Sequence, residues 1–326
     1  MENKILMEHG SGAKKTRELI EEFFVGKFNT KKITDEDAAL IFDNNLAFTT
    51  DSFIIEPEIF PGGDIGKLAV CGTANDLAVR GAKPKWLSSA YVISEGYPME
   101  KLQKITDSMA KVARKSGIEI VTGDTKVISK KEFSGIIINT SGVGIVVNPT
   151  SINNVKCGDV LIVSGSLGDH STAILTMREG IYLDSPVESD CAILYPMLEE
   201  IIKNKESGFI RDITRGGLTS ILYEIHIATG YGIEVKEELI PVKPGVRELC
   251  DIMGLDYLGM ANEGKVLLCV KEELASQVVD ELKKSKLGKN ATIIGKVTSA
   301  HNKVLLDKGN KQMIIMREHT NIPRIC

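Results

Sequence analysis

A segment rich in glycine and alanine, residues 61–84, constrains the fold of this chain more than any other stretch. It reads PGGDIGKLAVCGTANDLAVRGAKP, in which Asp64 can cap a helix and Gly81 with Pro84 can end it. We therefore expect a helix over residues 65–80. Its small side chains let another backbone approach closely, so the segment predicts a helix packed tightly against a neighbouring element.

Two polar residues of this helix, Asn75 and Asp76, fall beside its apolar stripe instead of on a solvated face. A buried carboxylate costs several kcal/mol unless a charged or hydrogen-bonding group satisfies it. One interpretation is an internal hydrogen bond to a neighbouring strand. The alternative is that Asp76 binds a metal ion or a nucleotide.

Length and charge limit the class of protein. The chain has 326 residues, 43% of them hydrophobic, and a net charge of −4. At about 150 residues per domain this length predicts two domains. The mild acidic balance and the lack of a basic block argue against nucleic acid or an anionic membrane as the main partner. Because the chain begins with charged residues and has no long apolar run, we expect a cytoplasmic protein without a membrane segment.

Six cysteines are spread along the chain without a zinc-type or disulfide-framework spacing. Five of them, at positions 71, 157, 191, 250 and 269, are expected to be small core residues. Cys326 is the exception, because it is the last residue of a short arm in which Pro323 disfavours helix. The arm could present a thiol to a substrate, or the cysteine could have no function.

Carboxylates follow predicted strands twice more in the first half of the chain. We expect Asp51 near the end of a strand that begins at Leu46, and Asp124 just after a buried strand over residues 118–121. Together with Asp76, these oxygen ligands suit Mg²⁺ that carries nucleotide phosphates. No Walker-type loop is present, so an ATP site here would be of another kind. Lys126 is either part of a surface ion pair or a base or phosphate ligand.

The pattern breaks near residues 148–151, where we place a domain boundary. In the second half, Asp212 lies at a glycine-rich helix start that suits either anion binding or a simple capped turn. Glu263 comes just before a predicted strand over residues 266–270 and could be an ordinary turn carboxylate. The predicted divisions are residues 1–37 (a loop and helix), 38–150 and 151–317 (two α/β domains) and 318–326 (a tail).

Several motifs together resemble one known family. They are HGSG at residues 9–12, PGGDIGKL at 61–68, CGTANDLA at 71–78, TGDTK at 122–126, RDITRGGL at 211–218, ANEGK at 261–265 and the terminal PRIC at 323–326. The combination closely resembles the HypE family of hydrogenase maturation proteins, over nearly the whole chain. Some motifs are shared with the wider superfamily of aminoimidazole ribonucleotide synthetase and selenophosphate synthetase, whereas the terminal PRIC is typical of the HypE family.

The resemblance implies a two-domain α/β (α+β) fold of the PurM-like type. The N-terminal domain would contain a mixed sheet with helices on one face and would form a homodimer that binds ATP in a cleft. The C-terminal domain would be an α/β sandwich, followed by a flexible tail that carries Cys326.

The resemblance also implies a reaction. A partner carbamoyltransferase, HypF, would load a carbamoyl group onto the terminal thiol, and ATP-dependent dehydration would convert it to a thiocyanate. The cyanide would then pass to iron on the HypC–HypD scaffold for [NiFe]-hydrogenase. Two alternatives remain open, namely another ATP enzyme of the superfamily, of the selenophosphate or aminoimidazole ribonucleotide synthetase type, and a thiol carrier without catalysis.

By the same resemblance, Cys326 is the carrier, and Lys126 and Glu263 handle protons. Mg²⁺ would be held by Asp51, Asp76 and Asp124. The residues implied to contact ATP and its metal are Asp51, Asp64, Lys67, Asn75, Asp76, Thr122, Gly123, Asp124 and Asp212.

Overall fold

The structure is a computed structural model that describes residues 4–6, 9, 14–25, 27, 36–41, 45–205, 208–309, 312–314 and 325. Its strands form a five-stranded sheet, a seven-stranded sheet and a two-stranded ribbon. The smaller sheet is built from residues 39–146 and the larger from residues 160–314. The division of strands follows the predicted α/β halves, although the exact boundary at residues 150/151 stays a prediction.

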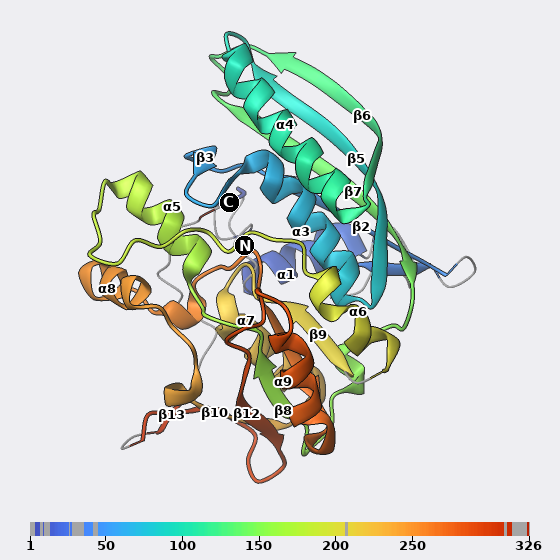
Figure 1. The fold of residues 1–326 in the computed structure, drawn as a ribbon, viewed down its shortest axis with the longest axis vertical. Coiled ribbons are helices and arrows are strands. Elements are labelled where there is room, and N and C mark those ends of the chain that lie inside the picture. The colour runs from blue at the N-terminus through green and yellow to red at the C-terminus, as the bar shows by residue number, and fades with distance from the viewer. Residues whose placement is uncertain are drawn as a thin grey trace.

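The N-terminal sheet has the strand order β1-β2-β7-β5-β6. Strand β6 runs parallel to β5, and the other neighbours are antiparallel, so the predicted mixed sheet is confirmed. Helices α3 and α4 cover one face, and α3 contacts β2, β5 and β7 (Figure 1). The bounds are β1 Ala39–Ile41, β2 Leu46–Phe53, β5 Ala82–Ser94, β6 Glu119–Ile128, β7 Ile136–Val146, α3 Ile65–Val79 and α4 Met99–Ser116.

Helix α3 contacts elements of both halves of the molecule. Asp64 caps it as predicted, because its Oδ1 accepts hydrogen bonds from the backbone N–H groups of Gly66 and Lys67, at 2.8 and 2.9 Å. Gly72 allows the close approach expected of the small residues, since a Cβ there would lie 2.8 Å from the ring of Phe53 on β2. The helix also contacts β9 and α6 of the second half (Figure 1). It is therefore packed between the two sheets.

The C-terminal sheet has the order β14-β13-β10-β12-β8-β11-β9. Every residue of the neighbouring strands β8 and β11 is buried. One face of these strands packs with α6 and α9, and the other packs with α7, which gives the predicted sandwich. The strands are β8 Val160–Val163, β9 Phe209–Asp212, β10 Gly232–Lys236, β11 Val266–Val270, β12 Thr292–Thr298, β13 Val304–Asp307 and β14 Gln312–Ile314; the helices are α5 Asp169–Glu179, α6 Tyr195–Lys203, α7 Gly217–Thr229, α8 Pro244–Met253 and α9 Ala275–Lys283.

Shorter elements connect these layers. They are α1 Lys14–Ile20, the π-helix Glu21–Val25, the ribbon of β3 Ile59–Phe60 and β4 Gly63–Asp64, and the 3₁₀ turns Ile152–Asn154, Glu237–Leu239, Tyr257–Gly259 and Glu272–Leu274.

Three expectations about local structure are wrong. The strand expected to be buried over residues 118–121 instead continues through residue 128 and is exposed along most of its length, because β6 is an edge strand that pairs only with β5. A short apolar run does not distinguish a central strand from an edge strand. Asp212, expected at a glycine-rich helix start, is instead the last residue of strand β9. Cys157 is exposed, whereas the other four cysteines expected in the core are buried.

Candidate functional site

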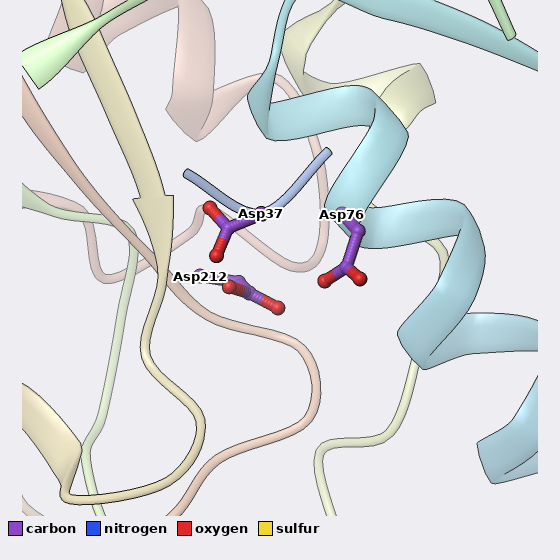
Figure 2. Close-up of side chains that lie close together, drawn as sticks. All are labelled: Asp37, Asp76 and Asp212. Carbon is purple, nitrogen blue, oxygen red and sulfur yellow. The ribbon is translucent and has the colours of Figure 1, made fainter. Parts of the chain in front are cut away.

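Three carboxylates meet where α3 lies against the second half of the chain. Asp76 comes from α3, Asp212 from the end of β9, and Asp37 from the segment before β1. One oxygen from each can be chosen so that all three lie within 4.8 Å of one another (Figure 2). Residues far apart in the sequence therefore form one acidic cluster.

The acidic cluster opens into a pocket between the two halves. The lining residues come from β2, α3, the end of β9, the loop between β9 and α7, and the loop before β11; they are Asp51, Ser52, Phe53, Gly72, Asp76, Asp212, Thr214, Arg215 and Glu263. Four carboxylates line this pocket, with one arginine among them. Such a surface favours a ligand that brings positive charge, such as a metal ion bound to phosphates.

Burial and mutual repulsion raise the pKa values of these carboxyl groups. Burial, followed by the charges of Asp51 and Asp212, raises the pKa of Asp76 well above its usual range. Burial and the charge of Asp37 raise the pKa of Asp212 well above its usual range. Burial raises the pKa of Asp37 to about 6, although Arg211 opposes the shift. A bound cation would lower these pKa values, because it stabilises the ionised carboxylates.

The acidic cluster suits Mg²⁺ by its chemistry. All of its donors are carboxylate oxygens, the ligand type that this ion prefers. Asp37 Oδ2 is buried and has no hydrogen-bond partner among the described residues, so one oxygen is available for a ligand. Thr49 Oγ1 lies 2.8 Å from Asp76 Oδ2 and 2.9 Å from the carbonyl oxygen of Asp37, which holds two of the three chain segments together.

Buried ion pairs fix the segment that carries Asp37. Arg211 Nε lies 3.1 Å from Asp37 Oδ1, and Arg211 Nη2 lies 3.2 Å from Glu224 Oε2. Arg80, just after α3, has its Nη1 3.0 Å from Glu36 Oε2. Each half of the molecule therefore supplies one arginine that holds residues 36 and 37 in place.

The side chains of two predicted cofactor residues hydrogen-bond to backbone groups nearby in the sequence. Asp64 caps α3, and Lys67 Nζ donates to the carbonyl oxygen of Gly62 at 2.7 Å. Neither residue lines the pocket described above. Their predicted contact with ATP stays a prediction.

Asn75 hydrogen-bonds to the backbone of the second half. Its Nδ2 donates to the carbonyl oxygens of Ala192 and Glu263 at 3.0 and 3.5 Å, and its Oδ1 accepts from the N–H of Leu194 at 2.9 Å. Because the amide is 1% exposed and bonded to backbone on both sides, it joins α3 to the second half. Its predicted contact with ATP stays a prediction.

The TGDTK motif lies outside the pocket of the same chain. Thr122, Gly123, Asp124 and Lys126 are in the exposed edge strand β6, and none of them lines the pocket. Asp124 was predicted to ligate the metal beside Asp51 and Asp76, but the described cluster contains Asp37 and Asp212 with Asp76. The predicted roles of Asp124 and Lys126 stay predictions.

The predicted thiol carrier, Cys326, lies outside the described residues. Its neighbour Ile325 is 6% exposed and belongs to the large hydrophobic core. The carbonyl oxygen of Ile325 accepts a hydrogen bond from Arg178 Nη2 at 3.3 Å. Flexibility of the tail stays a prediction.

Sequence reasoning missed Asp37. The signal was present, because Asp37 precedes two alanines and the short strand β1, and it adjoins the acidic residues Asp35 and Glu36. A charged run of this kind reads as a solvated surface unless its buried arginine partners are known. Those partners, Arg80 and Arg211, are far away in the sequence.

Comparison with known proteins agrees with this architecture. The family model for the N-terminal domain of AIR synthase related proteins matches residues 35–146 of this chain. The model for the C-terminal domain of the same family matches residues 156–308. The carbamoyl dehydratase HypE of Escherichia coli (strain K12) is 42% identical over 337 residues, covering 99% of this chain and all of that protein. The chain belongs to the HypE family.

Solved structures of HypE proteins share the fold. The HypE chain of a HypE–HypF complex superposes with a TM-score of 0.88 at 44% identity, covering 92% of this chain and 99% of that one. A HypE structure in complex with ATP superposes with a TM-score of 0.84 at 36% identity, covering 99% of this chain and all of that one. The two-domain PurM-like fold is therefore confirmed.

The structure also bears on the expectation that the protein has no membrane segment. No helix among the described residues is both long enough and apolar enough to cross a bilayer. The cytoplasmic location stays a prediction.

Proposed function

We propose that this protein is an ATP-dependent carbamoyl dehydratase that converts an S-carbamoyl group on its own Cys326 to a thiocyanate, which supplies the cyanide ligand for maturation of a [NiFe]-hydrogenase. The observation that carries this proposal is the full-length similarity to carbamoyl dehydratases of the HypE family, ending in a cysteine. The pocket supports the same conclusion, because its carboxylates suit a nucleotide with its metal.

The chemistry explains why ATP is needed. The oxygen of a primary amide is a poor leaving group. Transfer of the γ-phosphoryl group to that oxygen forms a C–O–P link and releases ADP. When the C–O bond breaks, phosphate leaves, the two N–H protons are removed and the C≡N bond forms. The net change is that the S-carbamoyl group loses one water and becomes a thiocyanate.

The residues divide this work between metal binding and proton transfer. We assign Asp37, Asp76 and Asp212 to Mg²⁺ binding, with Asp51 beside them in the pocket. The ion would neutralise phosphate charge. Glu263 is our candidate for one of the proton acceptors, because it lines the pocket and burial raises its pKa well above the usual range, which makes its carboxylate a stronger base than that of an exposed glutamate.

Lys126 and Asp124 fit this scheme if the protein is a homodimer. Strand β6 is the last strand of its sheet and pairs only with β5 among the described strands, and it exposes the apolar side chains of Ile120, Val121 and Val127, at 39, 58 and 64%. An exposed apolar edge strand is a typical pairing surface. We propose that two N-terminal sheets associate there, so that Lys126 of one protomer acts at a nucleotide site shared with its partner.

Two partner proteins complete the proposed pathway. HypF would load the carbamoyl group, in agreement with the solved HypE–HypF complex. A HypC–HypD scaffold would receive the cyanide on iron, which is the substrate of that step.

Intact-mass measurement tests the proposed function. After incubation with HypF, carbamoyl phosphate and ATP, Cys326 should gain a carbamoyl group and then lose the mass of one water. Cys326→Ala should show neither change. Consumption of ATP while the carbamoyl mass is retained would contradict the dehydratase, and catalysis without residues 321–326 would favour another ATP enzyme of the superfamily.

A further inference from the structure

We propose that Asp190 is a positioning residue for the dehydration step and acts by holding the backbone of Glu263. This inference rests on the proposed function, because it assumes that Glu263 accepts a proton from the substrate. Asp190 lies in the irregular segment between α5 and α6, and it is not among the residues that line the pocket.

The carboxylate of Asp190 accepts hydrogen bonds from three consecutive residues. Its Oδ1 accepts from the N–H of Glu263 at 3.0 Å, and its Oδ2 accepts from the N–H of Gly264 and from Lys265 Nζ, both at 3.1 Å. The side chains of Asp190 and Lys265 are 3 and 7% exposed. One buried carboxylate therefore fixes the start of the loop that carries Glu263.

Asp190 remains charged in this position. Burial opposes the charge, but Lys265 and the backbone hydrogen bond from Glu263 outweigh it, so the pKa of Asp190 lies below its ordinary value. Hydrogen bonds to a charged acceptor are stronger than bonds between neutral groups. The loop is thus held by charge-assisted bonds, and Lys265 balances the charge that makes them.

The backbone carbonyl group of Glu263 is held as well. Its carbonyl oxygen accepts from the N–H of Ala192 at 3.2 Å and from Asn75 Nδ2 at 3.5 Å. Asn75 precedes Asp76 of the acidic cluster, so the same contacts relate Glu263 to that cluster through α3. Gly264 is required for the close approach, because a Cβ there would lie 2.0 Å from the carbonyl oxygen of Asp190.

The side chain of Glu263 lines the pocket. Its backbone N–H and carbonyl are both occupied, and no other described residue hydrogen-bonds its carboxylate. A base must lie within hydrogen-bond reach of the proton it removes, and a displacement of about 1 Å can cost about a hundredfold in rate. Holding the backbone on both sides of Glu263 meets this requirement.

The decisive experiment is a double-mutant cycle on the full chain after carbamoylation by HypF. Single-turnover loss of water from Cys326 is followed by intact mass for the wild type, Asp190→Asn, Glu263→Gln and the double variant. We expect Asp190→Asn to slow the step at saturating ATP by about tenfold or more, with the KM for ATP changed by less than about twofold. In the Glu263→Gln background the same substitution should change the residual rate by less than about twofold.

Asp159→Asn is the matched control. Asp159 lies in the same half of the chain, is 8% exposed and accepts a backbone hydrogen bond from Lys156 at 2.8 Å, but it does not line the pocket. This variant should lose water at the wild-type rate. If Asp190→Asn does not fold, Lys265→Met replaces it, because that change removes one of the three donors; a slower step at unchanged KM, absent in the Glu263→Gln background, is again expected.

Three results would overturn the inference. A wild-type rate in Asp190→Asn would mean that the bonds to the loop do not serve catalysis. An equal loss with and without Glu263 would mean that Asp190 acts independently of it, and a higher KM at an unchanged rate would place its effect on ATP binding. If the wild type itself does not lose water, the proposed function fails, and the inference fails with it.

Discussion

Asp76 on α3 and Asp212 at the end of β9 face each other across the contact between the two sheets, with carboxylate oxygens within 4.8 Å (Figure 2). Each half of the molecule supplies one of these charges, and neither half can form the cluster alone. Burial raises the pKa of both carboxyl groups well above their usual range, and the charge of Asp212 adds to the shift at Asp76. The arrangement costs stability in the free protein and is explained if a cation binds there.

Removing one of these carboxylates should affect binding and stability in opposite directions. We expect Asp212→Asn to weaken binding of ATP in the presence of Mg²⁺ by about tenfold or more, and to change binding in excess chelator much less. Without ligand the variant should melt at a higher temperature, because a buried repulsion is removed. Calorimetric titration and thermal unfolding measure the two effects, with Asp159→Asn as the control; an unchanged affinity would argue against a metal ligand at this position.

The packing of α3 against β2 depends on Gly72. A Cβ at this position would lie 2.8 Å from the ring of Phe53, so Gly72→Ala should destabilise the protein by about 1–3 kcal/mol through overpacking. Denaturant unfolding measures the loss. The variant Gly72→Ala with Phe53→Leu should recover much of it, because the smaller side chain leaves room for the methyl group. A double variant that is less stable than the sum of the two single losses would show that the ring is not the obstacle.

Stability should fall in mild acid because of His170. This residue is fully buried in the first turn of α5, and burial lowers its pKa to about 4. An unfolded histidine titrates near 6.5, so between about 6.5 and 4 the unfolded chain binds the extra proton. The stabilisation is therefore complete above pH 6.5 and is lost as the pH falls towards 4, by about 3 kcal/mol in total.

His170→Asn tests this dependence. It keeps a polar group near Ser189, whose Oγ lies 2.8 Å from His170 Nδ1, but it cannot titrate. The variant should be less stable at neutral pH, and its free energy of unfolding should fall less between pH 6.5 and 4. Equal slopes in His170→Asn and the wild type would contradict the assignment.

Local sequence signals predicted α3 well because its caps are local. Asp64 and the glycine after the helix define its ends without reference to the rest of the chain. The position of Asp76 beside the apolar stripe also indicated a buried carboxylate. The same reasoning does not give the partners of Asn75, since neighbouring residues on a helix point about 100° apart. Asp76 therefore faces the pocket, while Asn75 faces the segment before α6.

The rest of the site depends on contacts between distant segments. Asp37 pairs with Arg211 of β9, and no local pattern around either residue encodes that pairing. Similarly, the apolar run before Asp124 indicates a strand but not whether another strand covers it. The edge position of β6 follows from the order of the whole sheet.

The edge strand β6 provides the test of the proposed homodimer. Val121 is 58% exposed there, so Val121→Arg should leave the single chain folded but place charges in the proposed interface. We expect sedimentation to show a monomer, and loss of water from carbamoylated Cys326 to fall at least about tenfold, because Lys126 of the partner no longer reaches the nucleotide. Ile252→Arg on α8, where the side chain is 57% exposed, should remain dimeric and active. A Val121→Arg monomer with full activity would mean that Lys126 acts within its own chain or not at all.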